Sequence, residues 1–421
     1  TSAGATPGAD GFPGFSPTQV GVAGQENVAL YVDLEADVTD RLLVGVAARY
    51  EDFSTFGDTD NYKAQVRYDF IENQGGFLND LAVRGTISTG FRAPTPGQQS
   101  VTKVSSVTNA NGDLVDSGQI PPTNPIALAL GAEPLQPEEA DNLSLGLVFT
   151  LFDKVTVTAD YFQIEVNDRI SLGGDIQVDG QVDDVLGTDS PLFDPAQPDR
   201  TVAEALEAIG VPGASAFTQV NFFTNDFDTT TEGFDIVATV DQNWGDLGDT
   251  NLSIAFNHTE TEVDSFTRDP DDPTEGLVID RERVIELENF NPEDRWVITA
   301  NHYLGDWRFM LRASYYDEWV DSGGGRFDTF GFSPACQDNL PAEDRLDECY
   351  GDQWLVDLEI GYTLNSRYRF TVGAENVFDE YPEEEFDMAS PFFSGNTYPT
   401  GSPFGFNGAF YYARFQADLD Y

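Results

Sequence analysis

WRFMLRASY, the stretch from Trp307 to Tyr315, carries an apolar or aromatic side chain at every second position. Between these side chains lie Arg308, Met310, Arg312 and Ser314, three of which are polar or charged. A period of two gives an extended strand one apolar face and one polar face. The same alternation recurs in Tyr62–Phe70, Asn142–Leu151 and Trp354–Tyr362. The pattern therefore predicts an all-β fold.

The links between these strands alternate in length. Extending the pattern gives about thirteen strands, near residues 27–37, 41–52, 61–72, 80–91, 140–152, 155–169, 217–242, 248–260, 293–303, 307–319, 352–363, 367–378 and 409–421. Links after odd-numbered strands are short, and those after even-numbered strands are longer, most of them by tens of residues. A soluble β-sandwich can share the strand pattern, but nothing in its architecture requires short and long links to alternate along the chain. We therefore predict a transmembrane antiparallel β-barrel with short periplasmic turns and long extracellular loops.

Aromatic residues gather beside the short links, as an aromatic girdle at a membrane interface would require. They are Phe70, Phe152, Trp244, Tyr303, Trp307, Tyr362, Tyr368 and Tyr421. In a barrel, the apolar faces contact hydrocarbon and not one another. We therefore expect Leu145, Leu311 and Ile360 to face lipid, and the alternate polar side chains to line the interior.

The composition excludes several classes of protein. The chain has 74 acidic and 21 basic residues, a formal charge of −53, which is the wrong sign for binding nucleic acid. Aromatic residues make up 13% of the chain, whereas acidic disordered chains are poor in them. No segment approaches the roughly 20 apolar residues that a membrane-spanning helix needs. Most of the acidity is expected to be solvated surface charge.

The sequence contains little that suggests catalysis or a bound cofactor. The two histidines, His258 and His302, lie in different predicted strands, and no phosphate loop, zinc spacing or nucleophile elbow occurs. We therefore predict no enzyme activity, no cofactor and no metal. Acidic runs in two long loops lack the ordered spacing of a calcium site, and we interpret them as solvated charge. They are Asp269, Asp271, Asp272 and Glu275 in one loop, and Glu383, Glu384 and Glu385 in another.

The only two cysteines, Cys336 and Cys349, share one polar stretch. Such a pair favours a disulfide that clips a loop in an oxidising compartment, with two free thiols as the alternative. The disulfide would stiffen one extracellular loop.

Several short segments, in order along nearly the whole chain, resemble the barrel of TonB-dependent outer-membrane receptors. They are Gly90–Thr95, Leu135–Glu138, Tyr161–Phe162, Asp168–Ile170, Glu232–Asp235, Asn291–Arg295, Asn376–Asp379 and Tyr411–Phe415. In such receptors Lys usually stands where Gln136 is, and Phe more often ends the chain than Tyr421 does. We interpret the prolines, asparagines and aspartates of these segments as fold markers.

The resemblance implies a receptor that takes up a scarce nutrient, which could be a siderophore, a glycan or a cobalamin. Barrels of this kind have 22 strands and a plugged lumen. Residues 1–25 would then be part of an extracellular loop, and residues 26–421 the C-terminal portion of the barrel. The plug and first strands would lie upstream. The implied partners are an inner-membrane energy-coupling protein that acts through the plug, an extracellular small-molecule ligand, and lipid with lipopolysaccharide.

Aromatic residues on the long loops are candidates for stacking against a ligand. The candidates are Trp319, Phe327, Tyr350, Phe392, Phe393 and Tyr398. Packing of the long loops against themselves is an equally good interpretation. On the inner face we expect arginines to pair with acids across the wall or to face the plug, because an unpaired buried charge is costly. The arginines are Arg67, Arg84, Arg308, Arg312 and Arg369, and the acids are Asp357, Glu359 and Glu375.

Two other functions remain open at this point. A passive porin of 14 strands would arise if the long segment Phe217–Gln242 formed two strands, and this chain alone would then close a stable barrel. A secreted β-rich enzyme or adhesin with calcium-bound loops would dissolve without detergent. A monomer in plain buffer would exclude both barrels.

Overall fold

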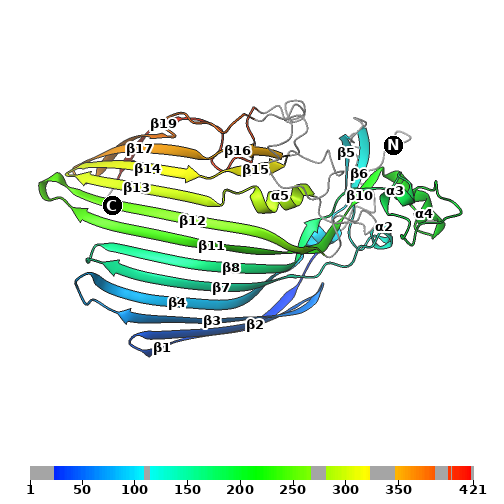
Figure 1. Cartoon of the computed structure of the whole chain (residues 1–421), viewed down its shortest axis with the longest axis horizontal. Helices are drawn as coiled ribbons and strands as arrows, with labels where there is room; N and C mark the ends of the chain where they lie inside the picture. Colours follow the sequence, from blue (N-terminus) through cyan, green and yellow to red (C-terminus); the bar gives the residue numbers. More distant parts are fainter. Residues whose placement is uncertain are drawn as a thin grey trace.

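The computed structural model describes residues 23–108, 114–266, 281–322, 347–384, 397–399 and 401–418. In this part of the chain, thirteen strands form one antiparallel sheet, each paired with the next (Figure 1). Their bounds are β1 (Asn27–Thr39), β2 (Leu42–Phe53), β3 (Gly57–Ile71), β4 (Leu78–Arg92), β7 (Glu138–Leu151), β8 (Val155–Leu172), β11 (Phe223–Asn243), β12 (Asp249–Phe266), β13 (Asp294–Leu304), β14 (Trp307–Tyr316), β17 (Gln353–Leu364), β18 (Tyr368–Glu375) and β19 (Phe410–Ala417). Among the described residues, β1 pairs only with β2 and β19 only with β18, so both edges of the sheet are open.

The two ends of the sheet differ, as the link lengths predict. At the left end in Figure 1 the strands join through tight turns, and at the right end the chain leaves the sheet for helices and small sheets. Phe152 and Asp153 have φ values of 53° and 56°, and Asn365 and Ser366 have 53° and 57°. Two consecutive residues with positive φ give a hairpin turn whose twist matches that of the strands it joins.

The two faces of the sheet also differ. Leu145, Leu311 and Ile360 are 53%, 47% and 44% exposed, so their side chains form no shared dry interior. We call this apolar side the outer face and the opposite, polar side the inner face. An apolar face left open by folding is stable in lipid, where the hydrocarbon replaces a protein core. The prediction that these side chains face lipid therefore agrees with their exposure.

Two long loops fold together into a small domain beyond the right end of the sheet, which we call the loop domain. It is built from the link between β4 and β7 and the link between β8 and β11. Its four-stranded sheet has the order β5 (Lys103–Thr108), β6 (Leu114–Gln119), β10 (Gln219–Asn221) and β9 (Ile176–Gln177). Its helices are α2 (Pro125–Ala129), α3 (Val182–Val185) and α4 (Val202–Ala208). Thr201 and Glu204 form a capping box that starts α4.

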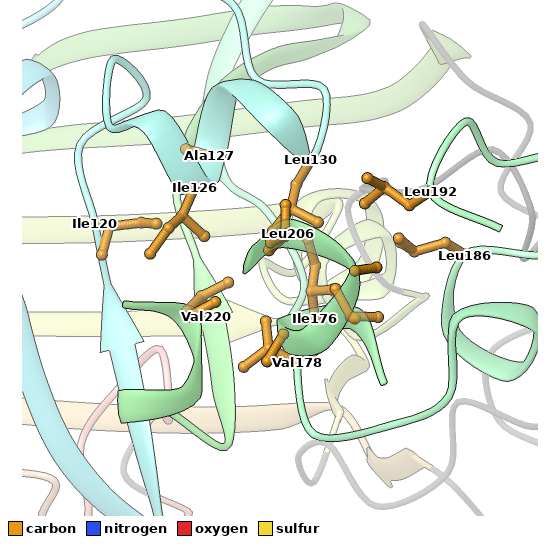
Figure 2. Packing of buried hydrophobic residues seen from close by; sticks show 14 of the residues in the cluster. Ile120, Ile126, Ala127, Leu130, Ile176, Val178, Leu186, Leu192, Leu206 and Val220 are labelled. Atoms are coloured by element: carbon orange, nitrogen blue, oxygen red, sulfur yellow. The ribbon is translucent and has the colours of Figure 1, made fainter. Parts of the chain in front are cut away.

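The loop domain has its own hydrophobic core (Figure 2). Its buried residues are Ile120, Ile126, Ala127, Leu130, Ala132, Ile176, Val178, Val182, Leu186, Leu192, Val202, Ala203, Ala205, Leu206, Ala214, Val220 and Phe222. Burying one Leu, Ile or Val side chain contributes about 1.5–3 kcal/mol. A cluster of this size therefore gives the two loops one preferred arrangement.

The remaining elements are α1 (Pro96–Ser100), α5 (Arg281–Asn289), β15 (Trp319–Ser322), β16 (Asp347–Tyr350) and the 3-10 turns η1 (Ala214–Ala216) and η2 (Gly245–Leu247). Of these, α1 lies in the link between β4 and β7 and η1 in the link between β8 and β11, and the others lie in other links. None of the helices in the described part of the chain is long and apolar enough to cross a membrane.

The predicted strand at Phe217–Gln242 is divided in the structure. Gln219–Asn221 forms β10 in the loop domain, and Phe223–Asn243 forms β11 in the large sheet. Phe222, which separates them, is buried in the core of the loop domain. The division adds no fourteenth strand to the large sheet, whose described strands number thirteen.

Candidate functional site

The inner face carries a network of charged side chains, as the sequence predicts. Arg308 Nη1 lies 2.6 Å from Glu359 Oε1, and Arg312 Nη2 lies 2.7 Å from Asp357 Oδ2. Glu359 is only 6% exposed and also accepts hydrogen bonds from Arg414 Nη2 at 2.8 Å and the Tyr412 hydroxyl at 2.7 Å. Two guanidinium groups and a hydroxyl compensate the buried carboxylate, which would otherwise be costly. This network ties β14, β17 and β19 together.

Glycines on the inner face let side chains meet across an intervening strand. Gly373 stands between Glu359 and Tyr412 in the sheet register. A Cβ at Gly373 would lie 2.4 Å from the Tyr412 ring. Gly146 stands between Arg84 and Asp160 in the same way. The absence of a side chain is therefore what allows these polar contacts.

The other predicted arginine pairings turn out differently. Arg67 pairs with Asp69 of its own strand at 2.8 Å, and Arg84 pairs with Asp160 at 2.7 Å. Within the described ranges, Arg369 forms no ion pair.

An ion pair joins the strands from which the loop domain emerges. Arg92 at the end of β4 donates two hydrogen bonds to Glu138 at the start of β7, one of them 2.6 Å long from Nε. The backbone N–H of Ile170 donates to the same carboxylate at 2.7 Å. Asn225 donates to the carbonyl oxygens of Gln136 and Asp168 at 3.0 and 2.7 Å. These contacts fix the base of the loop domain on β4, β7, β8 and β11.

These contacts were not predicted from the sequence. Arg92, Glu138 and Asp168 lie in segments that carry the family resemblance, in which only the prolines, Pro94 and Pro137, were interpreted as fold markers. The signal was the charge of the residues within those segments, namely an arginine in one and a glutamate in another.

Two of the predicted ligand-contacting aromatics are buried. Trp319 and Tyr350 are 2% and 4% exposed and stack on each other with ring centroids 4.3 Å apart. Phe290 packs edge-on against Trp319 at 5.9 Å. This aromatic cluster holds β15 and β16 against the segment that follows α5. The packing matches the alternative in which the long loops pack against themselves, and it leaves neither ring open to a ligand.

Tyr398 is half-buried and stacks on Tyr381 at 5.3 Å. The Tyr381 hydroxyl donates to Asp379 Oδ1 at 3.1 Å, and this hydrogen bond raises the pKa of the Tyr381 phenol. A ligand role for Tyr398 stays a prediction.

The remaining candidates, Phe327, Phe392 and Phe393, lie outside the described residues. So does Cys336, whereas Cys349 pairs with Val320 in the hairpin of β15 and β16. The disulfide therefore stays a prediction, which thiol alkylation before and after reduction would test.

The described residues offer little for metal chemistry. No group of three or more His, Cys, Asp or Glu side chains in them could hold a metal ion. The acidic run from Asp269 to Glu275 lies outside these residues. His258 Nδ1 lies 2.7 Å from Asp294 Oδ1, and His302 Nδ1 lies 2.9 Å from the Thr250 hydroxyl. Both histidines are therefore polar strand residues with a neighbour-strand partner.

A family model described as TonB dependent receptor-like, beta-barrel matches residues 1–377 of the chain. The chain belongs to this family. Proteins of this family are β-barrels of the outer membrane and are transporters, not enzymes, so the chain belongs in the outer membrane. A search of curated protein sequences found no match for this receptor chain.

Solved structures share the fold of this receptor chain at low sequence identity. The siderophore receptor PirA from Acinetobacter baumannii is 16% identical, with a TM-score of 0.57 over 93% of this chain and 46% of that one. A mutant of the ferric enterobactin receptor from Pseudomonas aeruginosa is 13% identical, with a TM-score of 0.58 over 98% and 47%. The FrpB iron transporter from Neisseria meningitidis is 11% identical, with a TM-score of 0.52 over 93% and 44%. The chain thus spans about half the length of the structures it matches.

Proposed function

We propose that the full-length protein containing this chain takes up a scarce nutrient across the outer membrane, driven by an inner-membrane energy-coupling protein. The observation that carries the proposal is the family match over residues 1–377. The apolar outer face and the charged inner face support it, because they suit a wall between lipid and a polar lumen. The folded loops at one end of the wall are suited to meeting ligands first.

A ferric siderophore is the ligand class we propose to test first. The support is that solved structures of the same fold carry the names of siderophore and iron receptors. A passive porin is the competing function, and it differs in needing no energy. Energy dependence is therefore the property that separates the two.

The test is uptake of 55Fe-labelled ferric enterobactin and of a 55Fe-labelled ferric hydroxamate by cells that lack the gene and by complemented cells. We expect complementation to restore uptake of one chelate, and a protonophore to abolish it. Uptake that survives the protonophore would support the porin instead. No difference between the two strains would exclude both of these chelates as ligands.

A pair of aromatic substitutions tests which end of the protein meets the ligand. Tyr398→Ala changes a loop residue, and Phe152→Ala changes an exposed aromatic in a hairpin turn at the opposite end. If Tyr398 contacts the ligand, the first variant raises the chelate concentration needed for half-maximal uptake and the second does not. Equal effects would contradict a ligand contact at Tyr398.

A further inference from the structure

One row of side chains on the outer face is polar, although the rows on either side of it are apolar. It lies near the left end of the sheet in Figure 1 and runs from the turn before β8 across β11, β12 and β13. Gln242 pairs with Thr250, and Thr250 pairs with His302. Lys154 extends the row, because its Nζ donates to Gln242 Oε1 at 3.1 Å. We call Lys154, Gln242, Thr250 and His302 the polar row.

The side chains beside the polar row are those expected of a lipid-facing surface. The next row toward the middle of the strands consists of Val155, Val240, Leu252, Ala300 and Leu311. On the other side, toward the turns, Trp244 and Trp307 are 54% and 46% exposed. Tryptophans on a lipid-facing surface mark the depth of the lipid headgroups. The polar row therefore lies at headgroup depth in the periplasmic leaflet, where the short turns are.

At the same end of the sheet, neighbouring strands are apolar or aromatic on the outer face. Tyr362 pairs with Trp307 in β14 and with Phe370 in β18. Leu151 pairs with Val155 in the hairpin of β7 and β8. Removing a polar side chain from water is costly unless a hydrogen-bond partner replaces the water. The polar row therefore calls for a polar partner in the lipid, which the strands beside it do not need.

Hydrogen bonds within the polar row leave two donors over. Trp244 Nε1 lies 2.9 Å from Thr250 Oγ1, which lies 2.9 Å from His302 Nδ1. An indole N–H can only donate, so the Thr250 oxygen accepts from Trp244, and its own proton goes to His302 Nδ1. The ring proton of His302 is then on Nε2. The Lys154 ammonium has three N–H groups and uses one for Gln242. His302 Nε2 and Lys154 Nζ can therefore both donate to an anionic oxygen.

The turns next to the polar row carry the opposite charge. Asp153, Asp246 and Asp306 lie in the turns before β8, before β12 and before β14, and all three are exposed. A complementary molecule must place an acceptor at the depth of the row and a cation further toward the periplasm. Phosphatidylethanolamine has this arrangement, because its ammonium group lies beyond its phosphate as seen from the acyl chains. As a zwitterion it is also not repelled by the formal charge of −53.

We infer that the polar row binds the headgroup of one phosphatidylethanolamine molecule in the periplasmic leaflet. The phosphate accepts hydrogen bonds from Lys154 and His302, and the ammonium faces the carboxylates of the turns. Gln242, where the Lys154 ammonium is held, and His302 are two strand spacings apart, about 10 Å. A phosphate with a hydrogen bond on each side spans about 8 Å, and the flexible Lys154 side chain closes the difference. This lipid site is additional to nutrient uptake, because it does not depend on which ligand is transported.

The test is titration of lipid into the delipidated full-length receptor in detergent, followed by native mass spectrometry. The probes are phosphatidylethanolamine and phosphatidylglycerol with the same acyl chains. We expect the wild type to bind one phosphatidylethanolamine more tightly than phosphatidylglycerol. Lys154→Ala and His302→Ala should each raise the apparent Kd for phosphatidylethanolamine by about tenfold, because each removes a hydrogen bond to a charged group.

The matched controls are His258→Ala and Lys103→Ala. His258 also lies on the outer face of β12, but its Nδ1 contacts Asp294 at the opposite end of β13 from His302, and Lys103 lies in the loop domain. Both variants should bind phosphatidylethanolamine like the wild type. The heat-modifiable band on gels checks folding, and the lipid preference of the wild type needs no variant.

Two results would overturn the inference. One is equal affinity of the wild type for the two lipids, and the other is the same affinity for phosphatidylethanolamine in His302→Ala as in His258→Ala. Neither result bears on energy-coupled uptake, which the protonophore assay measures separately.

Discussion

Gly146 offers a direct test of how the inner face is built. Arg84 Nε lies 2.9 Å from Asp160 Oδ1, and Arg84 Nη2 lies 2.7 Å from Asp160 Oδ2. This ion pair passes over Gly146, where an added Cβ would lie 2.1 Å from Asp160 Oδ1 and 2.6 Å from Arg84 Nε. Gly146→Ala should therefore separate the two charged groups.

The magnitude follows from three contributions. A hydrogen bond to a charged group contributes about 1.5–3 kcal/mol, but the Arg84 side chain is 51% exposed, which reduces the loss to about 1 kcal/mol. Forcing the side chains off their rotamers adds about 0.5–1.5 kcal/mol. Replacing a strand glycine by alanine returns about 0.5–1 kcal/mol.

Gly361→Ala is the matched control. Gly361 also lies on the inner face of a strand, but a Cβ added there would have its nearest neighbours at 3.6 Å and 3.8 Å, which is ordinary contact. This variant should be neutral or slightly more stable. The gain from replacing a strand glycine is common to both variants and cancels in the comparison. We therefore expect Gly146→Ala to be less stable than Gly361→Ala by about 1.5–2.5 kcal/mol, the sum of the lost ion pair and the rotamer strain.

The assay is urea unfolding of the refolded full-length receptor in detergent, followed by the heat-modifiable band on gels. A background with Arg84→Ala and Asp160→Ala removes both crowded side chains, so the penalty of Gly146→Ala should disappear there. Equal stability of the two glycine variants, or a penalty that persists in this background, would refute the reasoning.

Three further predictions concern the outer face, α5 and the loop domain. Leu145→Arg should lower the free energy of unfolding by about 2–4 kcal/mol, because it places a charge in hydrocarbon. Ser144→Arg on the inner face should lower it much less. Equal losses of the two variants in the unfolding assay would contradict a lipid-facing Leu145. Burial raises the pKa of Glu288 in α5 above 4.5, against an opposing hydrogen bond from the Val263 N–H. The stabilisation of α5 is therefore present below pH 4.5 and lost as the pH rises through the raised pKa. Hydrogen exchange of the α5 amides should therefore speed up with pH by more than the intrinsic exchange rate does. Glu288→Gln should abolish this additional increase in the exchange rate. Leu206→Ala should cost the loop domain about 2–5 kcal/mol and expose the bond after Arg200, the one trypsin site in residues 173–222, while the heat-modifiable band persists. An unchanged digest would argue against a separate core.

Local patterns in the sequence were sufficient to place the wall of the barrel. The alternation predicted a strand at Trp307–Tyr315, and β14 spans Trp307–Tyr316. It also predicted which side chains share the inner face, and Arg308 and Glu359 form an ion pair there. A strand repeats every two residues, so residues close in sequence carry the whole signal. Lipid hydrocarbon can contact any apolar face, so the sequence does not have to specify a matching protein surface for the outer face.

The candidate site could not be predicted in the same way. Trp319 and Tyr350 were candidates for stacking against a ligand, with packing of the loops against themselves as the equal alternative, and in the structure they stack on each other and are buried. Their contact depends on how β15 and β16 pair and on where Phe290 comes to lie. Neither the pairing of β15 with β16 nor the position of Phe290 produces a periodic pattern that can be recognised in a single sequence.

The strands, their two faces and the end from which the long loops leave all follow from the pattern of the sequence. That two of those loops share one hydrophobic core depends on tertiary packing. Ser117 and Gln219 pair in parallel although they are about a hundred residues apart, a non-local contact whose loop-closure entropy must be offset by packing. Such a contact becomes favourable only when the surrounding side chains, such as Val220 and Leu206, are buried together.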